Sequence, residues 1–421
     1  MLAPILFVLA LSAGSQAPTA EVLAEVRIHG NVLTPDDDVR QLAGLQVGMA
    51  IAPDTPADAA ARLRASRRFE HVEVLKRFAS ISDPTRIVLV VILDEGPVKI
   101  ESSADPGKPA RVLRKRGFRL MFLPVLKFED GYGFSYGARF ARAGPLGRRS
   151  QLSVPLTWGG DKRAAMELDK TLARGPVSRV EAGVSWSRRR NPFYAQNDDR
   201  QRVWFTAERD LPRSLRASAT AGWQHVAFLD RPAANARLLQ TGADLVFDTR
   251  LDPMLARNAA YARAGWNRTT GVPGEAVAAV NQTILDARGY LGFVGQSVLV
   301  VRALREDADR PVPPYLKSML GGVSNLRGFR TGTAVGDTLV ASSIELRVPL
   351  TSPLSIGKVG VSAFVDVAKA YDKGQRFGDQ KFERGIGGAV WFAAAFLRLN
   401  VAVAHGIGGS TRVHIGTTVS P

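Results

Sequence analysis

The sequence predicts an all-β transmembrane barrel of about 16 antiparallel strands, preceded by one small α+β domain. Two observations lead to this prediction. Helix-start signals and short strands occur over residues 20–98, whereas from residue 118 onward the helix-start signals stop. Segments of about ten residues then alternate between apolar and polar side chains, separated by clusters of Gly, Pro, Asn and Asp, as in barrels that cross a membrane with strands.

Residues 1–17 are predicted to form a signal peptide. Residues 3–13 are apolar and have the length of a signal-peptide core, and Ser15, Gln16 and Ala17 offer small residues to a signal peptidase. No Lys or Arg precedes the apolar run, which a misassigned start codon would explain. A buried strand or helix is the alternative. After residue 17, no apolar stretch reaches the roughly 18 residues that a membrane-spanning helix needs.

The composition excludes several kinds of site. The 421-residue chain is 45% hydrophobic, which is typical of a folded protein. Because it contains no Cys, it has no disulfide framework, no thiolate metal site and no cysteine nucleophile. Its 5 His show no metal-ligand spacing. We therefore expect neither a metal site nor a cofactor.

The net charge of +17 is distributed unevenly. Residues 18–98 carry 9 basic and 12 acidic side chains, and residues 99–421 carry 47 basic and 27 acidic ones. A basic excess can indicate nucleic acid or an anionic surface as the partner. Because the chain is predicted to be exported, we expect no nucleic-acid partner, and we assign the basic side chains to lumen faces and loops.

The small α+β domain is predicted over residues 18–98. Thr34, Pro35 and Asp36 are typical of a helix start, with Thr34 as the cap and Pro35 in the first helical position. Asp54-Thr55-Pro56 repeats the signal. The order of elements, β-α-α-β-β, fits a three-stranded sheet covered by two helices. The predicted strands span residues 24–31, 72–74 and 86–93.

Three segments of this domain match a known module. They are Gly30-Asn31, residues 68–74 and Asp94-Glu95-Gly96. Together they resemble a POTRA domain, the periplasmic module of outer-membrane assembly and secretion barrels. Residues 99–117 are predicted to be a basic linker, either a solvated tether or a segment that contacts the phosphates of lipid head groups.

The barrel itself is predicted over residues 118–421. Tight turns such as Gly144–Gly147 alternate with longer loops such as Arg188–Asp199, as expected for short periplasmic turns and long outer loops. Odd-numbered strands then run outward, and the barrel begins and ends at the periplasmic side. A soluble β-sandwich or propeller is the alternative, and in a sandwich polar side chains such as Glu345 would face outer solvent rather than a wet lumen.

The longest predicted loop, residues 305–336, contains Leu326-Arg327-Gly328-Phe329. This sequence resembles the signature of the BamA/TamA-like outer-membrane assembly and bacterial surface-antigen family. Strand 339–349 and Phe364-Val365-Asp366 match the next two motifs in order, although the family's usual Gly after that Asp is Ala368 here. The resemblance implies that the loop folds back into the lumen and that the protein lies in the bacterial outer membrane, with its POTRA domain in the periplasm.

The chemistry of these residues is consistent with an inward loop. A cation in a narrow lumen needs a carboxylate nearby, because desolvation is otherwise expensive. Glu345 and Asp366 can both point inward from neighbouring strands, and the planar guanidinium of Arg327 can bridge them. The predicted lumen motif consists of Leu326, Arg327, Gly328, Phe329, Glu345, Phe364 and Asp366.

The first and last strands of the barrel are predicted to meet at a weak junction. The last strand, around Thr411–Val419, is rich in Gly and Thr, and Gly416 lies inside it. Glycine weakens strand pairing, so we expect loose pairing with the first strand near Leu120–Lys127. The chain ends at Pro421, whereas family barrels commonly end in an aromatic residue.

No catalytic residue is predicted. Gly133–Gly137 fits the G-x-S-x-G pattern, but it lies inside a predicted strand rather than in the strand-to-helix elbow that a serine nucleophile needs. The sequence therefore favours a protein that is not an enzyme.

Two classes of function follow. The first is an insertase or translocase that binds nascent outer-membrane or secreted polypeptides through the POTRA sheet edge and assists their insertion or passage at the barrel junction. The second is a cationic outer-membrane pore or a dedicated two-partner-type secretion transporter. The expected partners are unfolded outer-membrane or secreted proteins, outer-membrane lipids and periplasmic accessory proteins.

Overall fold

The computed structural model describes residues 21–419 with short gaps, and the predicted signal peptide lies outside the described residues. The gaps fall at 32–33, 67, 70, 81–82, 96–97, 102–110, 115–119, 148, 173, 229–234, 251–255, 276, 352–356 and 395–396.

The N-terminal domain is a three-stranded sheet with two helices on it. The sheet has the order β1-β3-β2, with β1 parallel and β2 antiparallel to the central β3. Alternate side chains of the sheet pack against both helices, and Leu23, Leu63 and Leu89 are fully buried in this core. The elements are β1 (Val22–His29), α1 (Asp36–Ala43), α2 (Thr55–Ala65), β2 (His71–Phe78) and β3 (Arg86–Asp94).

The start of α1 differs from the prediction in detail. Pro35 occupies the N-cap position instead of the first helical one, and no side chain caps the helix. The Thr34 backbone N–H instead donates to Oε1 of the buried Glu95, at 2.9 Å. This contact ties the start of the helix to the end of β3, so tertiary structure replaces the predicted local cap.

The range predicted as a linker contains a short two-stranded sheet. β4 (Val98–Glu101) pairs antiparallel with β5 (Arg111–Arg114). The described part of this range therefore contains a short antiparallel ladder.

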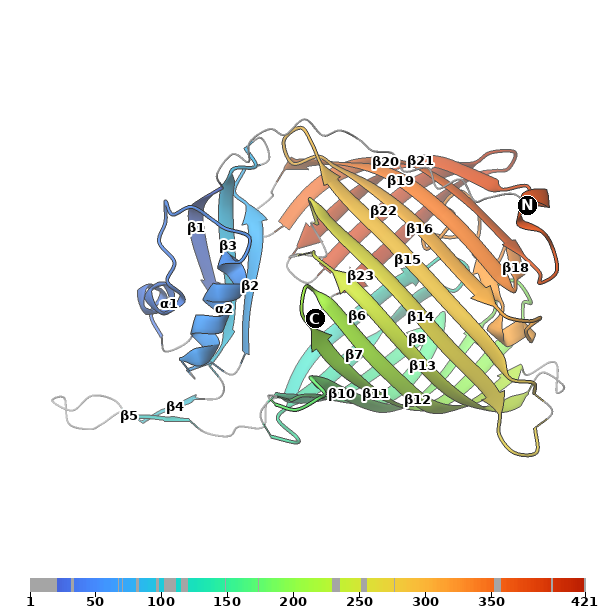
Figure 1. Ribbon diagram of the computed structural model, residues 1–421, viewed down its shortest axis with the longest axis horizontal. Coiled ribbons are helices and arrows are strands. Elements are labelled where there is room, and N and C mark those ends of the chain that lie inside the picture. Colours follow the sequence, from blue (N-terminus) through green and yellow to red (C-terminus); the bar gives the residue numbers. More distant parts are fainter. Residues whose placement is uncertain are drawn as a thin grey trace.

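The rest of the chain forms one 16-stranded antiparallel sheet that curves into a nearly closed barrel (Figure 1). Neighbours in sequence are neighbours in the sheet, except that β16 pairs with β19 across the longest loop. The strands are β6 (Leu120–Glu129), β7 (Gly133–Ala143), β8 (Ser150–Gly159), β9 (Asp161–Thr171), β10 (Arg179–Arg190), β11 (Asn197–Leu211), β12 (Leu215–Phe228), β13 (Ala236–Asp248), β14 (Ala259–Gly271), β15 (Val280–Gly292), β16 (Val298–Ala308), β19 (Thr338–Thr351), β20 (Gly357–Tyr371), β21 (Glu383–Ala394), β22 (Leu397–Gly406) and β23 (Thr411–Val419).

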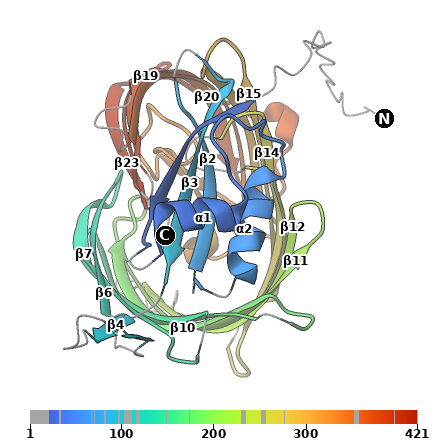
Figure 2. The same cartoon turned by 90° about the vertical axis from the view of Figure 1, so that its left-hand side faces the viewer.

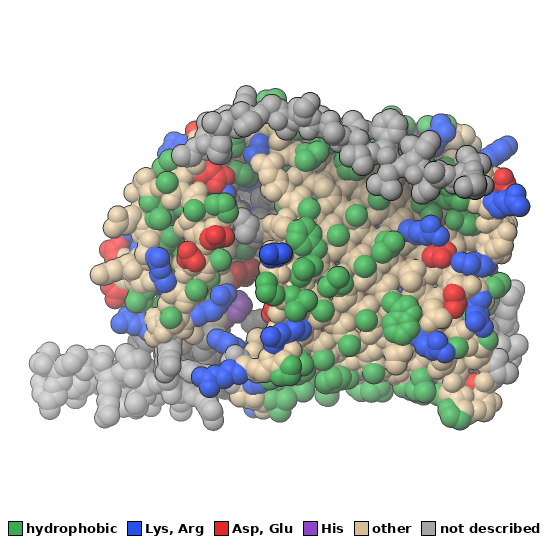
Figure 3. All heavy atoms as spheres, in the orientation of Figure 1, with side chains coloured by type: hydrophobic (Ala, Val, Ile, Leu, Met, Phe, Trp, Pro, Cys, Tyr) green, Lys and Arg blue, Asp and Glu red, His purple; other side chains and the backbone are tan. Residues whose placement is uncertain are grey.

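Apolar side chains cover the outside of the barrel. On β11, for example, Val203 and Phe205 are both 49% exposed, whereas Arg202 and Trp204, which alternate with them, line the lumen. The space-filling view shows apolar side chains spread over the wall, with charged ones gathered towards its two ends (Figure 3). This is the alternation expected of a wall between lipid and a wet lumen.

The helices in the described part of the chain are all too short or too polar to cross a membrane.

The two ends of the sheet meet without pairing. Each neighbouring pair in the sheet shares a ladder, but none of the ladders in the described residues joins β6 to β23, although these strands lie side by side. We call this junction the β6–β23 seam. The described residues of β6 number 10 and those of β23 number 9, close to the 10 of β8, whereas β11 and β20 have 15 each.

The longest loop runs from residue 309 to residue 337, slightly later than predicted. Residues 305–308 continue β16, because Arg305 and Asp307 still pair with β19. Within the loop, β17 (Ser318–Leu320) and β18 (Ala334–Gly336) form a small antiparallel ladder, preceded by a 3₁₀ turn at Pro314–Leu316.

The N-terminal domain lies across one opening of the barrel (Figure 2). Its β2 is the sheet strand closest to the barrel (Figure 1). The Phe78 ring at the end of β2 lies 5.6 Å from Arg257 Cζ and 5.6 Å from Lys358 Nζ, two cations of the barrel rim. Burial lowers the pKa of Arg77 to about 10, against the opposing effect of Glu73. The two domains therefore meet through an aromatic ring surrounded by positive charges.

Candidate functional site

The site begins with two neighbouring strands of the wall, β19 and β20. Alternation places Ser343 and Glu345 of β19 on the lumen side, with Ile344 between them 55% exposed on the outside. On β20, Phe364 and Asp366 face the lumen in the same way. In the ladder, Ser343 lies opposite Asp366 and Glu345 lies opposite Phe364. The two carboxylates therefore occupy diagonal positions on one inner surface.

Arg327 of the long loop reaches both carboxylates. Its Nε and Nη2 donate to Oδ2 and Oδ1 of Asp366, each at 2.7 Å, and its Nη1 donates to Glu345 Oε2 at 2.8 Å. Nη2 also donates to Ser343 Oγ at 3.1 Å. The Arg327 backbone N–H adds a bond to Asp366 Oδ2 at 2.9 Å. Arg327 thus pairs with Glu345 and Asp366 as the sequence predicts, with the two-pronged geometry that guanidinium groups favour.

This ion cluster is almost completely buried. Arg327 is 6% exposed, Glu345 7% and Asp366 2%. The guanidinium lies over the Phe364 ring, with Arg327 Cζ 3.3 Å from the ring centroid. Arg347 donates to the second oxygen of Glu345 at 2.8 Å, which balances two cations against two carboxylates. Because each buried charge has partners, the desolvation cost is offset and the loop is held in one place.

The neighbours of Arg327 in the loop hold it by packing. Leu326 is fully buried in a cluster with Leu304 and Leu339 of the wall. Phe329 packs against the edge of that cluster, and its ring lies above Gly406 of β22. The apolar contacts on both sides of Arg327 keep the loop tip against the strands.

Gly328 makes the turn that allows these contacts. Its φ of 92° lies in the left-handed region that favours glycine. Its N–H donates to Nε2 of His414 on β23 at 2.9 Å. Since Nε2 accepts this bond, the ring proton lies on Nδ1, which is 3.1 Å from Oδ2 of Asp130 in the β6–β7 turn. His414 is fully buried and therefore connects the loop with both sides of the seam.

A glycine of the wall supports the loop from below. A Cβ on Gly385 of β21 would lie 1.9 Å from the Arg327 carbonyl oxygen, so only glycine lets the loop backbone approach so closely. A Cβ on Gly406 would meet the Phe329 ring at 2.8 Å. The strands below the loop are therefore shaped to receive it.

The structure brings all seven residues of the predicted lumen motif into one cluster. Sequence reasoning missed His414, Asp130, Gly385 and Gly406. The alternation of β23 places His414 on the lumen side, and this pattern could have identified it as a residue that faces the loop. The two glycines carry no side-chain signal at all.

Within the described residues, no group of three or more His, Cys, Asp or Glu side chains is arranged to hold a metal ion. The G-x-S-x-G segment lies in β7, where Ser135 Oγ accepts the Asp161 backbone N–H at 2.9 Å. The contacts of Arg327, by contrast, fix the long loop inside the barrel, and we call this ion cluster the latch.

Comparisons with solved structures identify similar folds. The chain is 15% identical to BamA from Haemophilus ducreyi lacking POTRA domains 1–3, with a TM-score of 0.61 over 95% of this chain and 84% of that one. It is 13% identical to CdiB from Escherichia coli, with a TM-score of 0.56 over 97% and 92% of the two chains. CdiB from Acinetobacter baumannii is 12% identical, with a TM-score of 0.52 over 95% and 74%. At these identities the likeness shows the fold.

A comparison with curated proteins finds no match. The sequence profile of the Omp85 superfamily domain, however, matches residues 145–412, which is well over half of the chain. This range contains most of the barrel, the loop with Arg327 and both carboxylate-bearing strands. The chain is therefore a bacterial outer-membrane protein that belongs to the Omp85 superfamily.

Proposed function

We propose that the protein is an insertase or translocase for outer-membrane or secreted polypeptides. The observation that carries this proposal is the β6–β23 seam, where two strands lie side by side without a ladder among the described residues. An unpaired strand edge offers backbone donors and acceptors to another chain. A substrate strand that pairs with either edge would enter the wall from the side, driven by its own folding.

The N-terminal domain supplies the binding step in this proposal, as a single POTRA domain. The outer edge of β1 is partly covered, because Leu23 exchanges backbone hydrogen bonds with Met49 at 2.9 Å and with Gly48 at 2.7 Å. β2 has a ladder only with β3 in the described residues and lies on the barrel side (Figure 1). An extended polypeptide that adds to β2 would be held by main-chain hydrogen bonds that tolerate varied sequences.

A steadily open cationic pore is the weaker candidate. The loop is fixed inside the lumen by the Arg327 cluster, and the N-terminal domain lies across one opening. Both features obstruct steady flow. A dedicated secretion transporter uses the same parts but moves one passenger through the wall, and the fold likeness to CdiB favours keeping it as the second candidate. Outer-membrane lipids and periplasmic accessory proteins are the further partners we propose.

The test is folding of an unfolded outer-membrane protein into liposomes. We expect liposomes that contain the protein to fold the substrate several-fold faster than empty liposomes, measured by the heat-dependent gel shift of the folded barrel. A variant with a disulfide across the seam is the control, because it keeps the fold and closes the lateral route. Reduction of that disulfide should restore the rate.

Equal folding rates in empty and loaded liposomes would refute the insertase. A secreted passenger could instead cross the membrane and become protected from protease, without faster insertion of the outer-membrane protein. That result would identify the protein as a secretion transporter. Steady ion conductance in a bilayer, unchanged by the disulfide, would favour the pore.

A further inference from the structure

A second polar group lies on the lumen wall, away from the Arg327 cluster. It occupies the ends of β9, β10 and β11 that lie furthest from the N-terminal domain, where inward side chains line a cavity of about 340 Å³. Four arginines and two serines contribute to it: Arg163, Arg189, Arg200, Arg202, Ser185 and Ser187. None of them belongs to the family signature or to the latch around Arg327.

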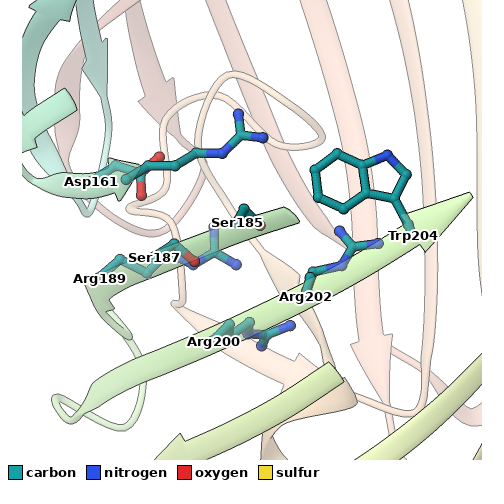
Figure 4. Close-up of a pocket in the computed structure, with 8 residues that line it drawn as sticks. Asp161, Ser185, Ser187, Arg189, Arg200, Arg202 and Trp204 are labelled. Carbon is teal, nitrogen blue, oxygen red and sulfur yellow. The ribbon is translucent and has the colours of Figure 1, made fainter. Parts of the chain in front are cut away.

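The strand register explains why a hollow forms here. Ser187 of β10 lies between Arg163 of β9 and Arg200 of β11. Ser185, one inward position further, lies opposite Arg202. Short serines between long arginines leave a space whose floor carries hydroxyl groups. Figure 4 shows Arg189, Arg200 and Arg202 around this space, with Trp204 beside it.

Two of the arginines already have carboxylate partners. Arg163 donates to Glu167 Oε1 at 2.6 Å, and Arg200 pairs with Asp198 at 2.7 Å. The other two contact aromatic rings instead. Arg189 Cζ lies 5.0 Å from the Tyr132 ring, and Arg202 Cζ lies 5.6 Å from the Trp204 ring.

In the described part of the chain, neither Arg189 nor Arg202 forms a salt bridge. Asp161 also lines the cavity, and Arg189 lies opposite Asp161 and Asp198 in the ladders. Together with Glu167, three carboxylates therefore accompany four guanidinium groups, and Arg202 has no carboxylate directly opposite it. Arg202 is exposed to the lumen and accessible to a ligand. Arg200 and Arg202 lie two positions apart on the same face of β11, so their like charges repel each other, and a bound anion would relieve that repulsion.

We propose that this cavity binds an oxyanion of the phosphate class. Its donors come from three strands, with guanidinium groups on both sides and hydroxyls on the floor. A tetrahedral anion can accept hydrogen bonds from several directions at once, whereas a carboxylate is satisfied in one plane by a single arginine. The phosphate can be free in solution or belong to a lipid head group at the outer rim.

The test uses the full-length protein folded in a non-ionic detergent. Thermal unfolding is followed at constant ionic strength while inorganic phosphate replaces chloride. We expect the melting temperature to rise with phosphate and to saturate, because a ligand that binds only the folded state stabilises it. In Arg189→Gln/Arg202→Gln the apparent affinity should fall at least tenfold. Arg268→Gln, an exposed arginine on the outward side of β14, is the matched control and should behave as wild type.

A second variant keeps every charge. Ser185→Leu fills the floor of the cavity and should also abolish the stabilisation by phosphate. If the substitution itself changes the unfolding temperature, phosphate binding is measured by isothermal titration calorimetry instead. Dihexanoyl phosphatidic acid added to the micelles tests the lipid source. Binding of inorganic phosphate supports a free anion, and binding of the phosphatidic acid alone supports a head group. Equal phosphate effects in wild type and both variants, or binding of a hexaglutamate peptide without binding of phosphate, would overturn the proposal.

Discussion

At Arg327, a single guanidinium connects a loop to two strands of the wall. Arg327→Ala should leave Asp366 and Glu345 buried without their main partner, at a cost of about 3–5 kcal/mol, and less where water enters. We expect a lower temperature for the heat-dependent gel shift and faster proteolysis of the loop. Arg330→Ala, an exposed arginine three residues further on, should have little effect.

The double variant with Asp366→Ala sharpens this test. Both substitutions break the same contacts, so their effects should be less than additive. Wild-type thermal stability in Arg327→Ala, or strict additivity with Asp366→Ala, would contradict a latch at this position.

His414 is the residue through which the loop contacts the last strand. His414→Leu keeps most of the volume but leaves the Gly328 N–H buried without an acceptor, which typically costs about 1–3 kcal/mol. We expect faster hydrogen exchange at Gly328 and lower thermal stability. His405→Leu, which changes an exposed histidine on neighbouring β22, is the control. Unchanged exchange at Gly328 would mean that His414 does not hold the loop.

The residues of the latch differ in how far the sequence could reveal them. Arg327, Glu345 and Asp366 could be paired in advance because a cation in a narrow lumen needs carboxylates and alternation places both of them inward. His414 could not, because its contact joins positions 86 residues apart along the chain. A functional role for the seven motif residues stays a prediction until these variants are measured.

At the scale of elements, the loop rests on β21 through the missing side chain of Gly385. Gly385→Ala would place a methyl group on the Arg327 carbonyl oxygen, so the loop tip must move away from the wall. We expect protease sensitivity of the loop close to that of Arg327→Ala. Gly388→Ala on the same strand is the matched control, since its Cβ would meet only Ser362 O at 3.4 Å. Similar loop protection in both variants would count against this support.

The β6–β23 seam allows a direct test of gating. One Cys in β6 and one in β23 should form a disulfide across the seam, and no native Cys competes because the chain has none. The locked barrel should keep its fold and lose its activity in the liposome assay, and a reductant should restore it. Full activity in a quantitatively crosslinked sample would exclude a seam that opens.

The elements show where sequence reasoning was strong and where it was limited. Alternation over some ten residues predicted the sixteen strands, because each strand needs one face for lipid and one for the lumen. The predicted Thr34 cap of α1 was wrong. The Thr34 backbone N–H instead contacts Glu95 at the end of β3, and the local sequence cannot reveal a contact with a residue so far along the chain. Boundaries such as the end of β16 depend on pairing with a strand 30 or more residues away.

For the whole molecule, the contact at Phe78 determines how the N-terminal domain sits on the barrel. Burying Arg77 close to Lys358 is unfavourable, so the contact between the two domains is expected to be weak. Phe78→Ala should therefore let the domain swing away. Spin labels at Val47→Cys and Val294→Cys, two exposed positions on the two parts, should show a broader distance distribution.

Asp38→Ala on α1 is the control for this experiment and should leave the distances unchanged. If Phe78→Ala also leaves them unchanged, other contacts hold the domain. The sequence predicted both parts of the molecule but not this arrangement, because the barrel-side cations come from separate turns and strands that only the closed sheet brings to one rim.

The unequal strand lengths have a consequence for the surrounding bilayer. A strand of 9 residues tilted by about 45° rises about 21 Å, and one of 15 residues rises about 35 Å. The hydrocarbon core of a membrane is about 30 Å thick. The wall is therefore low at a strand as short as β8, which has 10 residues, and tall enough at β11 and β20. Lipids beside such low stretches of the wall must compress or tilt to match them, so the bilayer around this barrel cannot have one uniform thickness.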